Sequence, residues 1–155
     1  MTDRELMARA IALSLESVAQ GGGPFGAVVA REGRILGEGQ NAVVPGRDPT
    51  AHAEVMAIRD ACARLGTHLL TGAILYTSCE PCPMCLAAAW WARCAGIVYG
   101  NDRSDAAAIG FDDAALYEEI ARPLAARRLP LRRLMAEEAR AAFRAWAAKP
   151  DKVPY

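Results

Sequence analysis

The chain has 155 residues, 53% of them hydrophobic and 23% charged, so it can bury the core of one ordinary domain. Its 18 Lys and Arg residues balance its 18 Asp and Glu residues, which argues against a protein that binds along a nucleic-acid backbone. The longest strongly apolar run, residues 86–92, is too short to span a bilayer, and the N-terminus lacks the apolar segment of a secretory signal. We therefore expect one cytoplasmic domain over residues 1–155, with no membrane partner.

Local patterns predict helices that alternate with strands. Thr2 and Glu5 form a capping box that opens a first helix, which ends before the glycines at residues 21–23. A hairpin is expected around Gly33, and Thr50 is the expected N-cap of a second helix. The expected strands are residues 27–30, 34–39, 73–77, 97–99 and 131–135, the later helices are residues 51–65, 82–94, 114–121 and 137–149, and residues 101–112 are expected to form a loop. This alternation predicts an α/β fold, with a mixed sheet covered by helices on both faces.

Two segments carry side chains suited to bind a metal. His52 and Glu54 lie at the start of one predicted helix, and Cys82 and Cys85 lie at the start of the next. A catalytic zinc takes three protein ligands and keeps its fourth position for water. His52, Cys82 and Cys85 supply three ligands, since an i, i+3 spacing places the two cysteines on one side of a helical turn. We therefore predict one zinc per chain, with Glu54 placed to take a proton from the metal-activated water and pass it on.

Two other interpretations of these residues stay open at this point. A closed structural zinc site needs a fourth ligand, for which Cys79 is the candidate, and would make the protein a zinc-stapled interaction module in which Glu54 is dispensable. A redox pair formed by the cysteines at residues 82–85 leaves the histidine and the glutamate unexplained. Cys62 and Cys94 are expected to be buried thiols outside the site.

A histidine and a glutamate separated by one residue, followed by Pro-Cys-x-x-Cys, form the signature of zinc-dependent base deaminases. This chain carries both halves, at residues 52–54 and 81–85. From Pro24 to its C-terminus it resembles the cytidine deaminase-like superfamily. The resemblance implies a three-layer α/β/α sandwich around a mixed sheet of about five strands.

Within that superfamily, several stretches are similar to bacterial guanine deaminases. They are residues 48–54, 76–85 and 91–93, the loop at residues 104–113 with its Gly-Phe-Asp-Asp sequence, residues 117–120, and the terminal tyrosine. The loop and the tyrosine distinguish this branch from tRNA adenosine deaminases, which share parts of the first two stretches. The resemblance implies hydrolysis of guanine to xanthine and ammonia, in a homodimer whose C-terminal segments are exchanged.

The same resemblance implies how a purine would be held. Asn41, Asp113 and Tyr155 would hydrogen-bond its edges, while Phe25 and Trp91 would lie against its faces. These residue types suit a purine, because amides and carboxylates match its polar groups and aromatic rings match its π-face. The tail at residues 150–155, stiffened by two prolines, would complete the site of its own or a partner subunit.

The main alternative is adenosine deamination in tRNA. Residues 122–149 would favour it, because they contain eight Lys and Arg residues and only two acidic residues. A solvated helix face would show the same excess, since 16 of the chain's 18 cations are arginine. A cytosine or cytidine deaminase is a more distant alternative. We expect a small purine substrate rather than a nucleic acid.

Overall fold

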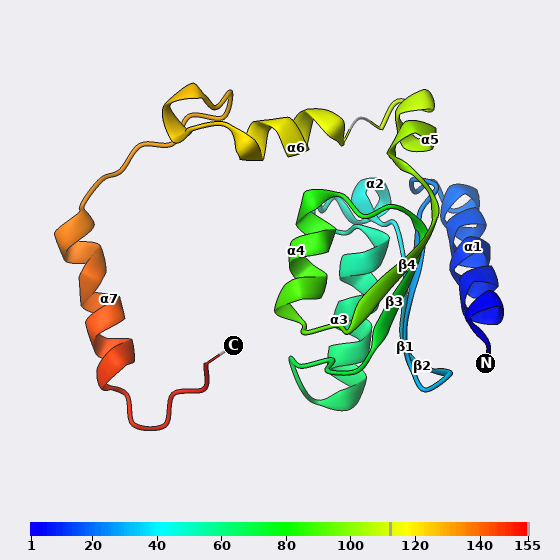
Figure 1. The fold of residues 1–155 in the computed structure, drawn as a ribbon, viewed down its shortest axis with the longest axis horizontal. Helices are drawn as coiled ribbons and strands as arrows, with labels where there is room; N and C mark the ends of the chain where they lie inside the picture. Colours follow the sequence, from blue (N-terminus) through cyan, green and yellow to red (C-terminus); the bar gives the residue numbers. More distant parts are fainter. Residues whose placement is uncertain (112, 155) are drawn as a thin grey trace. The chain divides into compact units, whose positions relative to one another are not determined.

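The computed structural model describes residues 1–111 and 113–154, which divide into two compact units (Figure 1). The first unit is Met1–Leu116, and the second begins at Tyr117. That both units belong to one domain stays a prediction. Tyr155, expected in the substrate site, lies outside the described residues. No helix among the described residues combines the length and the hydropathy that crossing a bilayer requires.

The first unit is built on a mixed sheet of four strands in the order β2-β1-β3-β4, one fewer than expected. β1 (Gly26–Arg31) pairs antiparallel with both β2 (Arg34–Gln40) and β3 (Ile74–Cys79), whereas β4 (Gly96–Asn101) runs parallel to β3. The predicted hairpin is confirmed, and Gly33 in its turn has the positive φ of 72° that glycine adopts readily.

Helices cover both faces of this sheet, which confirms the predicted three-layer sandwich (Figure 1). α1 (Asp3–Ala19) packs on one face, where Leu6 and Leu13 share a core cluster with Tyr76 of β3. α3 (Ala53–Leu65) and α4 (Pro83–Trp91) lie on the other face. The two helices pack side by side, as the sequence predicts.

The close packing of α3 against β2 depends on residues without bulk. The face of α3 toward the sheet carries alanines, and Ala53 and Ala57 are fully buried. A Cβ atom at Gly39 would lie 2.2 Å from the carbonyl oxygen of Ala53, and one at Gly37 would lie 2.4 Å from the amide nitrogen of Ala61. Since no side chain fits in that space, the glycines of β2 let α3 rest directly on the sheet.

Three local features of the first unit differ from the sequence prediction. The N-cap of α3 is His52 and not Thr50, because the amide and the hydroxyl of Thr50 both donate to the carboxylate of Asp48. Residues expected to form a loop contain α5 (Arg103–Ala108), which Asp102 opens as N-cap of a capping box. A short helix, α2 (Val43–Gly46), was also not predicted.

The second unit begins within α6 (Ala114–Ala121), which crosses the boundary between the units. It contains the 3-10 helix η1 (Leu124–Ala126) and α7 (Ala136–Ala148), so the helices predicted near residues 114–121 and 137–149 are confirmed. The strand predicted at residues 131–135 is wrong. These residues have no regular structure and are paired with none of the four described strands, so they lack the hydrogen-bonded ladder that a strand requires.

Candidate active site

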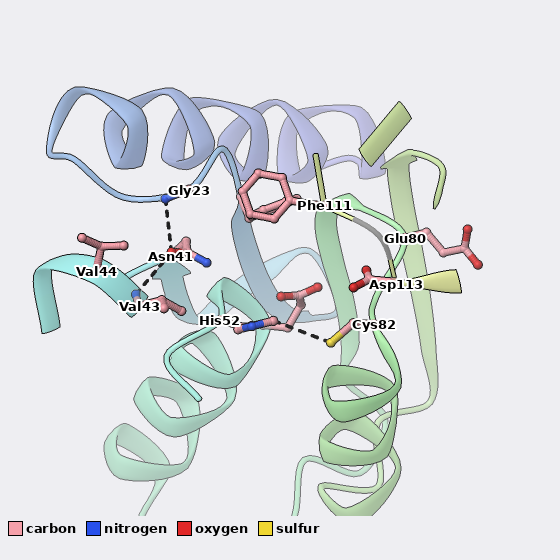
Figure 2. Close-up of a pocket in the computed structure, with 11 residues that line it drawn as sticks. Gly23, Asn41, Val43, Val44, His52, Glu80, Cys82, Phe111 and Asp113 are labelled. Carbon is pink, nitrogen blue, oxygen red and sulfur yellow. Dashed lines mark hydrogen bonds between the residues drawn. The ribbon is translucent and has the colours of Figure 1, made fainter. Parts of the chain in front are cut away.

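The starts of α3 and α4 bring the predicted metal ligands together. His52 is the N-cap of α3 and Cys82 the N-cap of α4, and neither side chain hydrogen-bonds its own helix end. Cys85 lies one turn into α4. The Nδ1 atom of His52 is 3.6 Å from the Sγ atom of Cys82 (Figure 2). It is 3.5 Å from the Sγ atom of Cys85, and the two sulfur atoms are 3.6 Å apart.

These separations fit a tetrahedral zinc ion. Zinc bonds of about 2.0–2.1 Å to nitrogen and about 2.3 Å to sulfur place tetrahedral ligand atoms roughly 3.6–3.8 Å apart. Over residues 1–111 and 113–154, His52, Cys82 and Cys85 are the one group of His, Cys, Asp and Glu side chains whose ligand atoms converge for a metal. The donor set of one imidazole and two thiols is of the kind that zinc prefers.

Cys79 lies close in sequence but is not part of this group. Its thiol lies 3.7 Å from the carbonyl oxygen of Asp102, with the geometry of a weak hydrogen-bond donor. Burial raises the pKa of Cys79 to about 11, so the residue stays a thiol at neutral pH. The described residues thus give three convergent ligands and no fourth, which is the pattern of a catalytic zinc site.

Hydrogen bonding prepares the cysteines for a cation. The hydrogen bond between the sulfur atoms of Cys82 and Cys85 lowers the pKa of Cys82 to about 4 and raises the pKa of Cys85. The hydrogen bond to Cys82 also raises the pKa of His52. Zinc binds cysteine as the thiolate, so metal binding releases the protons that these two thiols still hold.

Glu54 lies in the first turn of α3, directly beside the ligands. Its side chain is only 6% exposed, and its Oε2 atom accepts a hydrogen bond from Cys85 at 3.4 Å. Burial raises the pKa of Glu54, because the charged form loses its hydration. A carboxyl group with a raised pKa can both accept and return a proton near neutral pH.

A cavity of about 190 Å³ opens over Glu54 and His52 (Figure 2). Of the residues expected to hold a substrate, Phe25, Asn41 and Asp113 line it. Residues that were not predicted also line it, namely Gly23, Val43, Val44, Glu80 and Phe111. Val43 and Val44 belong to the short helix α2, which no sequence pattern predicted.

Asn41 presents a fixed amide to this cavity. Its Oδ1 atom accepts hydrogen bonds from the backbone amides of Gly23 and Val43, each at 3.2 Å. Figure 2 shows the amide nitrogen on the other side of the group, directed into the pocket. Because its oxygen already accepts two hydrogen bonds, the Asn41 side chain can donate hydrogen bonds to a ligand rather than accept them.

Phe25 and Phe111 form an aromatic wall of the pocket. Their ring centroids are 4.9 Å apart and the ring planes meet at 88°, which is a favoured edge-to-face arrangement. Phe111 belongs to the Gly-Phe-Asp-Asp loop, so the sequence signal that marked Asp113 also covered this residue.

Glu80 ties this loop region to the sheet. Its carboxylate accepts hydrogen bonds from the guanidinium of Arg103 at 2.7 and 2.8 Å and from the Arg103 backbone amide at 3.2 Å. The pKa of Glu80 is lowered, chiefly by the Arg103 side chain. Glu80 follows β3 and Arg103 opens α5, so the pair fixes the segment that leads to Phe111 and Asp113.

The structure does not bring Trp91 to this pocket. Trp91 is the last residue of α4, about 13 Å along the helix from the ligand end, and its side chain is 56% exposed. The guanidinium carbon of Arg93 lies 5.8 Å from its ring centroid. The expected position of Trp91 against a purine is therefore not found in the pocket of its own chain. That expectation came from the family resemblance, whereas the predicted helix over residues 82–94 already placed residue 91 near the end away from the ligands.

Residues 1–101 match the sequence model of the cytidine and deoxycytidylate deaminase zinc-binding region. The chain is 47% identical to guanine deaminase of Bacillus subtilis (strain 168), over 100% of both chains. The X-ray structure of guanine deaminase from Bacillus subtilis superposes with a TM-score of 0.96, covering 100% of this chain and 99% of that one at 47% identity.

Two further relatives match over part of the chain. A structure of guanine deaminase from Nitrosomonas europaea has a TM-score of 0.70 at 37% identity and covers 72% of this chain and 65% of that one. The tRNA-specific adenosine deaminase of Haemophilus influenzae is 37% identical over 72% of this chain and 68% of its own length. With its His-Cys-Cys centre and these matches, the chain belongs to the zinc-binding cytidine and deoxycytidylate deaminase family.

Proposed function

We propose that this protein is a zinc-dependent guanine deaminase, which hydrolyses guanine to xanthine and ammonia. The observation that carries the proposal is the similarity to a guanine deaminase over the whole of both chains, at 47% identity and with a TM-score of 0.96 for the corresponding structure. The cavity of about 190 Å³ supports it. Pockets for drug-sized ligands measure about 300–1,000 Å³, so this one suits a single base better than a nucleotide.

His52, Cys82 and Cys85 hold one zinc ion per chain in this proposal. The support is the agreement of their mutual distances with tetrahedral coordination and the lack of a fourth convergent ligand among the described residues. When bound, the zinc supplies a Lewis acid that lowers the pKa of a water molecule toward neutrality.

Glu54 moves the protons. It takes a proton from the attacking water and delivers it to the ring nitrogen next to C2 of guanine, as the new C–O bond forms. It then takes the second proton of the same oxygen and delivers it to the exocyclic amine, so the C–N bond breaks and ammonia leaves. Guanine and water thus give xanthine and ammonia with Glu54 regenerated, and the burial of Glu54 supports this exchange by raising its pKa.

The purine is oriented by groups on the walls of the pocket. Asn41 donates its amide hydrogens to an acceptor on the base, and the carboxylate of Asp113 accepts from a ring N–H. Phe25 and Phe111 shield the base from water. The support is the position of all four residues on the same cavity and the fixed orientation of the Asn41 amide.

The active protein is a homodimer with exchanged C-terminal segments, in which Tyr155 completes a purine site. The support comes from the apolar side chains of the second unit. No described residue from Tyr117 onward is buried, and Phe143 of α7 is 78% exposed. Apolar surface of this kind marks a site of association. The cytoplasmic location expected from the sequence stays a prediction.

Ammonia release from a set of substrates tests the proposed activity. The zinc-loaded protein is incubated with guanine, adenine, cytosine, cytidine and a tRNA that carries adenosine at the wobble position. We expect ammonia and xanthine from guanine and no inosine in the tRNA. Inosine formation without guanine turnover would replace the proposal by adenosine deamination in tRNA.

A further inference from the structure

Ser17, near the end of α1, connects three segments of the first unit through one buried hydroxyl group. Its side chain is fully buried, and its Oγ atom lies 2.7 Å from the carbonyl oxygen of Gly23 and 2.9 Å from that of Asn41. A serine within a helix commonly bonds its own preceding turn, as Ser14 does with the carbonyl oxygen of Ile11 at 2.7 Å. Ser17 instead contacts two segments outside its helix. They are the glycine loop, formed by the glycines at residues 21–23, and Asn41, which follows β2.

The backbone of the glycine loop lies directly against Ser17. The amide of Gly22 donates to the carbonyl oxygen of Ser17 at 2.8 Å. A Cβ atom at Gly22 would lie 2.4 Å from the hydroxyl of Ser17 and 2.3 Å from the carbonyl oxygen of Asn41. No side chain fits between these atoms, so Gly22 permits the three segments to meet at the Ser17 hydroxyl.

One of the two residues that the Ser17 hydroxyl contacts, Gly23, also orients the side-chain amide of the other, Asn41. The backbone amide of Gly23 donates to Oδ1 of Asn41, and the amide of Val43 donates to the same atom. Figure 2 shows these two bonds on one side of the Asn41 side chain and its nitrogen on the other, toward the pocket. Any shift of the Gly23 or Asn41 backbone therefore moves the donors that face the ligand.

We infer that Ser17 is a positioning residue for purine recognition. Its hydroxyl fixes the backbones of Gly23 and Asn41, and through them the two N–H groups that Asn41 directs to the base. Ser17 itself does not line the pocket, so it acts through Gly23 and Asn41, which do. The inference rests on the proposed function for the identity of the ligand, although the arrangement of Ser17, Gly23 and Asn41 is independent of it.

Ser17→Ala tests the inference, with Ser14→Ala as the matched control. Both variants remove a buried hydroxyl from α1, but Ser14 bonds only its own helix. We expect Ser17→Ala to raise the KM for guanine about tenfold, the equivalent of one buried hydrogen bond, while kcat and zinc content stay within about twofold. Ser14→Ala should leave KM unchanged, and Ser17→Thr, which keeps the hydroxyl, should restore most of the loss.

A double-mutant cycle separates positioning from a general loss of stability. Once Asn41→Ala has removed the amide, Ser17→Ala should raise KM by less than about twofold further, because residues that act through one another are not additive. A tenfold increase in both backgrounds would overturn the inference. Should Ser17→Ala fail to fold, Ser17→Cys takes its place with the same expected results, because a thiol is a poor donor.

Hydrogen exchange of the ligand-free protein supplies a readout that does not depend on activity. The amides of Gly23 and Val43, which donate to Asn41, should exchange faster in Ser17→Ala than in Ser14→Ala and the wild type. Unchanged exchange at these two amides would overturn the inference. A wild type inactive toward guanine would refute the proposed function instead, and the exchange rates would then decide the role of Ser17 alone.

Discussion

The two compact units differ in what they do with their apolar residues. The first unit buries Val28, Val29 and Leu75 completely, and every residue of the candidate site lies within it. In the second unit no described residue is buried, and Leu129 and Phe143 are more than 70% exposed. The first unit therefore holds its own core and its own metal ligands. The second carries apolar side chains for which its own residues provide no interior, so changes in the two units should have separable effects.

The largest effect should follow from loss of a metal ligand in the first unit. Cys82→Ser should abolish both zinc binding and activity, because two of three ligands do not hold a catalytic ion. Cys79→Ser is the matched control and should keep one zinc per chain, since Cys79 lies outside the ligand group. Elemental analysis of the purified variants measures the difference. Equal loss of zinc from both would contradict the three-ligand centre.

Glu54→Gln should separate metal binding from proton transfer within the same unit. The amide nearly matches the carboxylate in size but cannot exchange protons. We expect a fall in kcat of roughly 10²–10⁴, the usual contribution of a general acid–base group, at unchanged zinc content. Steady-state kinetics and metal analysis of the same preparation provide the measurement. Near-normal turnover would show that Glu54 is not the proton shuttle.

Deletion of residues 150–155, at the end of the second unit, should lower activity without loss of zinc. The truncated protein should keep its zinc, because the ligands belong to the first unit. Its activity on guanine should fall at least tenfold if Tyr155 completes a site, since the pocket would lose a hydrogen-bonding group and a barrier to water. Kinetics, zinc content and sedimentation of the truncated and full-length proteins measure these properties. Full activity after truncation would remove the tail from the site.

The smallest effect should come from the Glu80–Arg103 pair, which is partly exposed. Arg103 lowers the pKa of Glu80, so the pair stabilises the folded state above the ordinary glutamate pKa of about 4.3, and this contribution is lost as the pH falls through the lowered value. Glu80→Gln should cost less than about 1 kcal/mol at pH 7. Denaturant unfolding of both proteins should show the difference shrinking on acidification, and a growing difference would contradict this role.

The metal centre could be predicted from the sequence because its chemistry is encoded locally. His52 with Glu54, and Cys82 with Cys85, each occur within one helical turn, and each pair lies where a helix begins. N-cap residues and glycines likewise predicted the hairpin and most of the helices. The sequence also contains a signal for α5, since Asp102 and Asp105 form a capping box at its start.

The remaining features depend on tertiary contacts that no local pattern expresses. Trp91 is the last residue of α4, and only the tertiary packing around that end decides whether it meets a pocket. Thr50 has the residue type of an N-cap, yet its bonds to Asp48 compete with that role. The strand expected at residues 131–135 needs a neighbour that the described chain does not supply. Substrate residues such as Asn41 came from the family resemblance rather than from the pattern around them.

Product formation from free guanine tests most directly whether the His52, Cys82, Cys85 and Glu54 centre performs the proposed reaction. Wild type and Glu54→Gln, each loaded with one zinc per chain, are compared for xanthine and ammonia released from guanine. The wild type should form both products in equal amounts, and Glu54→Gln should form almost none. Absence of xanthine from the zinc-loaded wild type, or equal rates for the two proteins, would contradict guanine deamination at this site.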